Sequence, residues 1–443
     1  MFWKIATAAT LSAIAVAASG TGAASPQFPS KLSLCPGPLL GTTWSTRTLG
    51  SADFDNAAGI AVDEARCAIY LAGDARGTIG AASAGAQDAV VARYDTRGVR
   101  LWAVQFGSPG YDYVDGVGVD ADGDVFVLGR TDDTLPGSPV VNLGAQDMFL
   151  VKLDSTGAIL WTRMFGSAGS ENPEGLAITP AGEIYVTGFT DGVLTGVSAG
   201  GQDYFLGRYD TDGNLVMITQ RGSAGNDRAK AVAVGPAGNP YIVGDTDGDL
   251  EGVQAGNADI FVAKYDPAGA ELWIDQRGTT DLDLGAGIAV NDHNEVFAVG
   301  STALGLDGNV SAGAMDVVVI RYGTGGAWQY TVQRGSSSAD TADGVALTAS
   351  GAPVVTGSTS GTLDGIAPAG ASDTFVMKLT RGGAWSWTRL IGGATFDFAA
   401  AVAVTSRDHV YAAGDFGISI NGVATVGLRD LFAASWDGTG TVR

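Results

Sequence analysis

The chain has 443 residues, of which 67 are glycine and only 16% are charged. This composition suits many short strands joined by tight turns, and it argues against a helical fold, which needs long charged, Leu- and Ala-rich stretches. The formal net charge of −22 disfavours nucleic acid and anionic membrane surfaces as partners. It favours cations, including Ca²⁺ and basic proteins, or solubility outside the cell.

The first residues have the pattern of a secretory signal peptide. Lys4 supplies a positive charge, residues 5–18 form a short apolar stretch, and residues 22–24 offer a small-residue cleavage site. The apolar stretch is too short to span a bilayer comfortably. We therefore expect a signal peptide over 1–24, an N-terminal segment over 25–41, and an exported protein, secreted or at the cell surface, without membrane insertion.

The rest of the chain is a sevenfold repeat. A marker glycine returns at intervals of 57, 59, 56, 56, 57 and 57 residues. The marker glycines are Gly50, Gly107, Gly166, Gly222, Gly278, Gly335 and Gly392. A period this long and this regular indicates one supersecondary unit copied around or along an axis.

The second repeat shows what that unit is. Strand patterns occur at 116–119, 125–129, 147–153 and 160–165, each with period-2 patterning or β-rich composition between Asp- and Gly-containing turns. Four antiparallel strands in one repeat make the blade of a β-propeller.

The two ends of the repeated region predict how the ring closes. The last repeat has a third strand, Asp430 to Trp436, but no fourth strand before Arg443. The segment 42–50 supplies a fourth strand without the three that should precede it. We therefore predict an all-β, seven-bladed β-propeller over 42–443, in which the N-terminal strand completes the last blade and removes exposed sheet edges.

The fourth repeat carries the clearest family pattern. Its matching positions are Gly222, Ser223, Asp227, the small–bulky run 231–234, Gly238, Asn239, Gly244 and the strand 259–266. These residues resemble the bacterial seven-bladed β-propeller repeat family called SBBP, and the resemblance covers about 42–443. It implies an exported or cell-surface propeller, and it transfers no catalytic residue, because the repeated positions look structural.

Two acidic columns recur in all seven repeats, in loops on the same face of the ring. The first column, five residues after each marker glycine, contains the ligand-binding candidates Asp55, Asp112, Glu171, Asp227, Asp283, Asp340 and Asp397. The second opens each third strand and contains Asp88, Asp147, Asp203, Asp259, Asp316, Asp373 and Asp430. Together they would form a crown of carboxylates able to bind Ca²⁺ or cationic groups. The alternative is that each carboxylate accepts backbone N–H groups and fixes its own loop.

Three short sequences resemble the start of a calcium loop. They are Asp-x-Asp-Gly-Asp/Asn at 120–124, 210–214 and 245–249. The distal glutamate and the flanking helices of an EF-hand are absent, and two of the three fall where every repeat has a turn. We expect no cofactor, with Ca²⁺ as the alternative, and we assign no metal ligands.

One position varies between repeats in a way that suggests a single site. Just before the small–bulky run the seven repeats have Ala58, Asp115, Glu174, Lys230, Ala286, Asp343 and Ala400. If this position faces the axis, Asp115, Glu174 and Lys230 form a polar arc on consecutive blades, able to do acid–base chemistry with mutually shifted pKa values. The alternative is a solvated rim with an incidental ion pair. The long insertion at 132–142 could form a wall beside the arc.

The two cysteines are candidates for a disulfide. Cys35 precedes the closing strand, and Cys67 lies in a turn of the first blade on the same face, where Arg66 replaces the usual glycine. An exported protein allows them to pair across the seam of the ring.

No catalytic signature is apparent in the sequence. His293 and His409 lie in separate turns, and no nucleophile–histidine constellation, phosphate loop or clustered basic footprint is present. We expect an exported, non-enzymatic, monomeric propeller that binds a protein or carbohydrate ligand. The alternatives are a secreted lyase or hydrolase that uses Asp115, Glu174 and Lys230 at the axial mouth, and a structural protein of the envelope or matrix.

Overall fold

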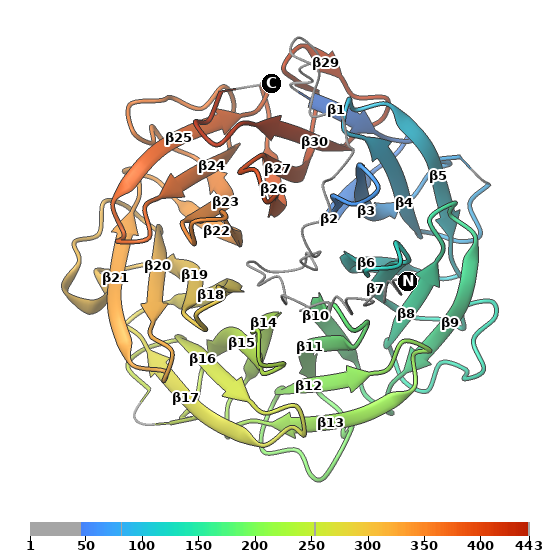
Figure 1. Cartoon of the computed structure of the whole chain (residues 1–443), viewed down its shortest axis with the longest axis horizontal. Helices are drawn as coiled ribbons and strands as arrows, with labels where there is room; N and C mark the ends of the chain where they lie inside the picture. The colour runs from blue at the N-terminus through green and yellow to red at the C-terminus, as the bar shows by residue number, and fades with distance from the viewer. Residues whose placement is uncertain (1–45, 81, 252–253, 442–443) are drawn as a thin grey trace, which may run out of the picture.

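Seven four-stranded antiparallel sheets surround a central axis in the computed structural model, which describes residues 46–80, 82–251 and 254–441 (Figure 1). The predicted seven-bladed β-propeller is confirmed. In each blade the first strand lies nearest the axis and the fourth forms the outer edge of the ring (Figure 1).

The strands follow the repeat closely. Blade 1 has β2 (Asp55–Asp63), β3 (Ala68–Ala75), β4 (Asp88–Asp95) and β5 (Arg100–Phe106). Blade 2 has β6 (Asp112–Val119), β7 (Val125–Thr131), β8 (Asp147–Leu153) and β9 (Ile159–Phe165). Blade 3 has β10 (Glu171–Ile178), β11 (Ile184–Thr190), β12 (Asp203–Tyr209) and β13 (Leu215–Arg221). Blade 4 has β14 (Asp227–Val234), β15 (Pro240–Thr246), β16 (Asp259–Tyr265) and β17 (Glu271–Arg277).

The remaining blades differ in small additions. Blade 5 has β18 (Asp283–Val290), β19 (Val296–Thr302), the 3-10 turn η1 (Leu306–Gly308), β20 (Asp316–Tyr322) and β21 (Trp328–Arg334). Blade 6 has β22 (Asp340–Leu347), β23 (Pro353–Thr359), β24 (Asp373–Leu379) and β25 (Trp385–Ile391). Blade 7 has β26 (Asp397–Val404), β27 (Val410–Phe416), β30 (Asp430–Trp436) and β1 (Thr46–Leu49). The loop of blade 7 also forms a small hairpin, β28 (Ser419–Ile420) and β29 (Val423–Ala424), which the sequence did not predict.

The ring closes as predicted. Strand β1 pairs antiparallel with β30, with Thr46 opposite Ala434 and Leu49 opposite Leu431. The sheet order β1-β30-β27-β26 therefore joins the two ends of the chain in one blade. Pairing β1 with β30 satisfies the backbone edge that β30 would otherwise expose.

Every first strand contains a β-bulge, and the bulge creates the site. In blade 2 the register shifts between Val114 and Gly116, so that Asp115 is the extra residue. The equivalent extra residues in the other blades are Ala58, Glu174, Lys230, Ala286, Asp343 and Ala400. A bulge re-aims a side chain out of the alternation of its strand. Here it turns one residue per blade toward the axis.

Neighbouring blades interlock through an aromatic side chain and a glycine. The Trp102 ring lies against Gly157 of the next blade, and its indole N–H donates to the Ser155 carbonyl oxygen at 3.1 Å. Gly157 has a positive φ of 91°, which favours glycine, and a Cβ there would sit 3.2 Å from the indole. The contact between ring and glycine repeats at Trp161–Gly213, Trp273–Gly326, Tyr330–Gly383 and Trp387–Gly440. These aromatic residues therefore pack between blades.

The described residues contain no helix that is long and apolar enough to cross a membrane. The predicted signal peptide over 1–24, the segment 25–41 and Cys35 lie outside the described residues. The disulfide between Cys35 and Cys67 therefore stays a prediction.

Candidate axial binding site

The first acidic column lies inside the protein. Each of its seven carboxylate side chains belongs to a residue with 0% exposure. Asp112 is representative: it accepts the Ser108 backbone N–H at 2.6 Å and the Ser108 hydroxyl at 3.1 Å. Burial raises the pKa of Asp112 to about 6, although hydrogen bonds from Thr131 and Ser108 oppose that rise. Its carboxylate is therefore committed to the loop that begins β6.

The second acidic column is built in the same way. Asp88 accepts the backbone N–H groups of Ala84 at 2.8 Å and Gly85 at 3.1 Å, and the side-chain amide of Gln105 at 2.9 Å. The marker glycine separates the two columns, because a Cβ on Gly107 would lie 2.5 Å from an Asp88 oxygen and 2.6 Å from an Asp112 oxygen. This contact explains why the marker position is glycine. The arrangement supports the structural alternative for both columns.

The carboxylates of the Asp-Gly turn at 120–124 already bind groups of the protein itself. The Asp120 carboxylate accepts the backbone N–H groups of Asp122 at 3.0 Å and Asp124 at 2.9 Å. The Lys152 ammonium lies 2.9 Å from Asp124 and 3.7 Å from Asp120. The described residues contain no group of three or more His, Cys, Asp or Glu side chains placed to hold a metal ion.

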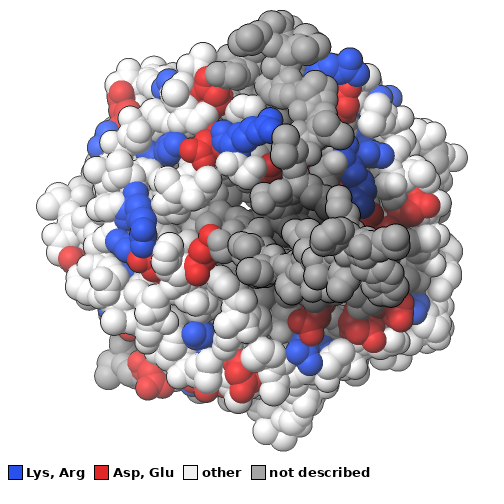
Figure 2. All heavy atoms as spheres, viewed as in Figure 1, with Lys and Arg blue, Asp and Glu red and all other residues white. Residues whose placement is uncertain are grey.

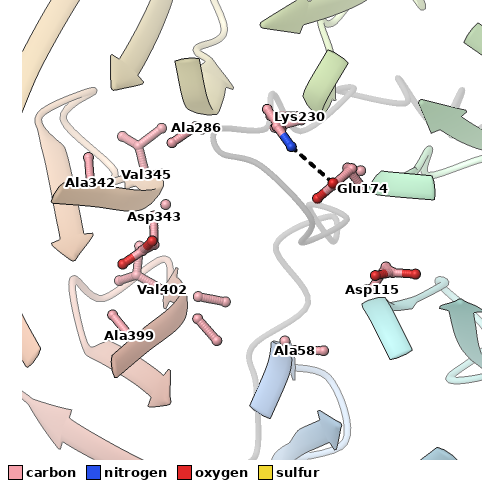
Figure 3. A pocket seen from close by; sticks show the side chains of 18 of the residues that line it. Ala58, Asp115, Glu174, Lys230, Ala286, Ala342, Asp343, Val345, Ala399 and Val402 are labelled. Atoms are coloured by element: carbon pink, nitrogen blue, oxygen red, sulfur yellow. Dashed lines mark hydrogen bonds and ion pairs between the residues drawn. The ribbon is translucent and has the colours of Figure 1, made fainter. Parts of the chain in front are cut away.

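The seven bulge residues surround a cavity at the centre of the ring (Figure 3). The cavity has a volume of about 650 Å³, and glycine, alanine and valine of the first strands form most of its wall. Its polar lining side chains are Asp115, Glu174, Lys230, Asp245, Ser301, Thr341 and Asp343. The insertion at 132–142 does not line it, and Leu135 of that insertion packs instead in the core between blades 1 and 2.

The structure joins two of the three arc residues and separates the third. The Lys230 ammonium lies 3.0 Å from a Glu174 carboxylate oxygen, and the two side chains point toward one another across the boundary of blades 3 and 4 (Figure 3). Lys230 also lies 5.1 Å from the centre of the Phe189 ring. Asp115 instead forms an ion pair with Arg130 of its own blade. Burial raises the pKa of Asp115 well above its usual range, while Arg130 opposes that rise.

Asp343 is the cavity residue that the sequence interpretation passed over. It occupies the bulge of blade 6, across the cavity from Lys230 and Glu174 (Figure 3). Burial raises the pKa of Asp343 to about 8, and the negative charge of Asp415 adds to the rise. The signal was present in the sequence, since Asp343 stands in the variable column. It was missed because its neighbours on blades 5 and 7 are alanine, so it belongs to no run of polar residues.

A second inner position, the residue after the glycine of the second strand, links two of the blades to the next. Ser301 accepts the Ala342 backbone N–H, which precedes the next bulge, at 2.9 Å. Ser358 accepts from Ala399 at 3.2 Å in the same way. Blade 2 has Arg130 at this position, and the facing residue of blade 3 is Pro173, which has no N–H to donate. Ser301 and Ser358 therefore join neighbouring blades.

Five aromatic rings, four exposed and one half-buried, lie beside the start of the first strands on three consecutive blades. We call this group the aromatic arc; its members are Phe396 and Phe398 on blade 7, Phe54 on blade 1, and Tyr111 and Tyr113 on blade 2. The rings of Phe396 and Phe398 are nearly parallel with centres 6.1 Å apart, and those of Tyr111 and Tyr113 are nearly parallel at 6.2 Å. Phe396 is 54% exposed and Tyr111 is 41% exposed. The arc lies on the face where the loops enter the first strands.

Charged side chains of both signs are interspersed around the ring on the face seen in Figure 2. Among the described residues, Glu295 forms ion pairs with both Arg321 and Arg381, each at 2.7 Å. Such pairing neutralises basic groups locally.

Comparison with known proteins agrees with the fold. The beta-propeller repeat model SBBP matches residues 101–135. The predicted SBBP resemblance is confirmed. The regulatory protein FlaEY of Caulobacter vibrioides is 28% identical over 369 residues, which are 73% of this chain and 38% of that relative. The chain thus spans well under half of the length of FlaEY.

Two solved structures align with most of this chain. A polysaccharide lyase, Uly1, aligns with 88% of this chain and 90% of its own at 11% identity, with a TM-score of 0.49. A gluconolactonase from Xanthomonas campestris aligns with 89% of this chain and 99% of its own at 12% identity, with a TM-score of 0.41.

Proposed function

We propose that this protein is an exported, non-enzymatic SBBP-repeat propeller that binds a protein or carbohydrate ligand at the axial cavity. The observation that carries the proposal is the bulge position. There the polar residues differ from blade to blade and line an open cavity, whereas the repeated carboxylates are buried in their own loops. A single ligand needs one asymmetric site, and the bulge position supplies it.

The aromatic arc supports the choice of ligand classes. Exposed ring faces can stack on the faces of sugars, and aromatic residues are enriched in the central contacts of protein interfaces. The relative FlaEY is named a regulatory protein, which agrees with a role in binding. Fold alone decides nothing here, because propellers carry many unrelated functions.

The test is a glycan array and a peptide array probed with the mature protein. Ala286→Trp and Ala400→Trp would each fill part of the cavity, because both side chains line it. Ala268→Trp is the matched control, since Ala268 is exposed in the turn between β16 and β17. Binding that the cavity variants lose and the control keeps is the expected result. Binding unaffected by both cavity variants would move the site elsewhere, and no binding on either array would favour the structural role.

Export is tested separately. N-terminal sequencing of protein recovered outside the producing cells should begin just after residues 22–24. An intact N-terminus on protein retained in the cytoplasm would contradict export.

A lyase or hydrolase is the second candidate. It is favoured by Asp115, whose buried carboxyl has a raised pKa and could hold a proton for general acid catalysis. Asp115→Asn, Glu174→Gln and Lys230→Met should each reduce turnover of a substrate if this candidate is correct. Unchanged turnover in all three variants would dismiss it.

A further inference from the structure

Asp343 differs from the other charged bulge residues in lacking a partner. Asp115 is paired with Arg130, and Glu174 is paired with Lys230. Among the described residues, no hydrogen bond or ion pair to the Asp343 side chain is found, although it lines the cavity. Asp343 is half-buried, and a partly buried carboxylate without a counter-ion favours a ligand that brings one.

A neighbouring carboxyl group strengthens this demand for positive charge. Asp415 on β27 is 7% exposed, and its Oδ1 atom has no hydrogen-bond partner. Asp415 is the charged group that acts on Asp343. The nearest compensation is Arg429, whose guanidinium lies 3.6 Å from the other Asp415 oxygen. Arg429 therefore pairs with Asp415, whereas Asp343 has no such partner among the described residues.

The wall around Asp343 is small and apolar. Its neighbours in the variable column are Ala286 on blade 5 and Ala400 on blade 7, and Val345 and Val402 also line the cavity there. Figure 3 shows Asp343 on the opposite side of the cavity from the Lys230–Glu174 pair. An apolar wall next to a carboxyl group matches an alkyl stem with a charged head. The described residues there include no group of three or more His, Cys, Asp or Glu side chains placed to hold a metal ion.

We propose that Asp343 receives the ammonium group of a lysine side chain presented by a protein ligand, with the alkyl stem against Ala286 and Ala400. This inference rests on the proposed function and names its ligand class. The Asp343 carboxyl then supplies the counter-ion, and the ammonium replaces the missing hydrogen bonds.

The pH dependence of binding follows from the same arrangement. In the free protein the pKa of Asp343 is about 8, so the carboxyl is largely protonated at pH 7. A bound ammonium favours the ionised form, so binding releases a proton. The affinity should rise about tenfold per pH unit below that pKa and level off above it.

The experiment is calorimetric titration with the peptide acetyl-Gly-Lys-Gly-amide at pH 6.5 and pH 9.0. The matched peptide carries acetyl-lysine, which keeps the stem and removes the charge. We expect the lysine peptide to bind at least tenfold more tightly at pH 9.0 than at pH 6.5. Binding at pH 6.5 should release protons, so the measured binding enthalpy should differ between two buffers of different ionisation enthalpy. The acetylated peptide should bind at least tenfold more weakly.

The variant Asp343→Asn retains the shape of the neutral acid and should lose both the binding and its pH dependence. Asp122→Asn removes the same charge from an exposed turn between β6 and β7 and should change neither. Two results with the wild-type protein alone would overturn the inference. One is equal binding of the two peptides, and the other is binding of the lysine peptide at pH 6.5 without proton release. A third result would overturn the inference but preserve the proposed function. In that case Ala286→Trp abolishes binding of a ligand found on the arrays, whereas neither Asp343→Asn nor a change of pH alters that binding.

Discussion

The Lys230 ammonium lies 3.0 Å from the Glu174 carboxylate and joins blades 3 and 4 at the cavity. The two side chains are 28% and 30% exposed, so solvent screens the pair. Exposed ion pairs of this kind contribute about 1 kcal/mol or less. We expect Lys230→Met to change the free energy of unfolding by less than about 1 kcal/mol in urea denaturation. A loss several times larger would show that the pair holds the ring together.

Calcium should not stabilise the protein, because Lys152 already occupies the Asp120–Asp124 turn with its ammonium 2.9 Å from Asp124. We expect superimposable thermal melting curves in millimolar Ca²⁺ and in EDTA. A bound ion at a hundredfold excess over its Kd would add about 2.7 kcal/mol to the native state. A calcium-dependent rise in Tm would contradict this expectation and would favour the acidic columns as metal sites.

The contact between Gly326 and Trp273 should be sensitive to a single methyl group. A Cβ on Gly326 would lie 2.8 Å from the indole, at a backbone φ of +85°. Gly308 is the matched control, since its φ is +84° and nothing lies within 4 Å of its Cβ position. We expect Gly326→Ala to cost about 1–3 kcal/mol more in free energy of unfolding than Gly308→Ala, because overpacking adds to the backbone strain. Equal losses, measured by chemical denaturation, would mean that the indole moves aside freely.

A carboxylate of the first acidic column should contribute more to the free energy of unfolding than to ligand binding. Asp340 accepts the Ser336 backbone N–H at 2.5 Å and the Thr359 hydroxyl. Asp340→Ala leaves these buried donors unpaired and should cost about 1–3 kcal/mol of stability for each one. The control Asp122→Ala, in an exposed turn, should stay within about 0.5 kcal/mol of the wild type. A folded Asp340→Ala variant of normal stability that loses ligand binding would contradict the structural role.

The protein should lose stability as the pH rises from 6 to 9. The folded-state pKa values of Asp343 and Asp415 are raised from 3.8 to about 8 and about 7. A carboxyl with a raised pKa binds its proton more tightly in the folded state, so its contribution is complete below about pH 4 and is lost as the pH rises through the folded pKa. Glu295 has a lowered pKa of about 2, so it responds in acid and is constant in this range.

We therefore expect a lower Tm at pH 9 than at pH 6, measured by calorimetry, and a smaller difference in Asp343→Asn. A Tm that is flat across this range would mean that water or ions compensate the two carboxyl groups in the folded protein.

The sequence by itself determined the seven blades, the strand order and the closure of the ring. These features depend on local patterns, namely period-2 alternation, Asp-Gly turns and the spare strand at one end that matches the missing strand at the other. The contact of Trp102 with Gly157 joins two columns that are visible in the sequence, although Met217 takes the place of the aromatic residue against Gly269. The variable column that contains Glu174 and Lys230 was likewise recognised before its geometry was known.

The tertiary structure decided which of the acidic residues face the cavity and which are buried. Asp112 and Asp115 lie three residues apart in one strand, yet the first is bound inside its loop and the second lines the cavity. The ammonium of Lys152 enters the Asp-Gly turn from another strand, and the isolation of Asp343 depends on what neighbouring blades leave empty. The burial and the pairing of a side chain depend on contacts between segments that are distant in the sequence. The local sequence around a repeated aspartate therefore does not reveal whether it is buried in a loop or lines the cavity.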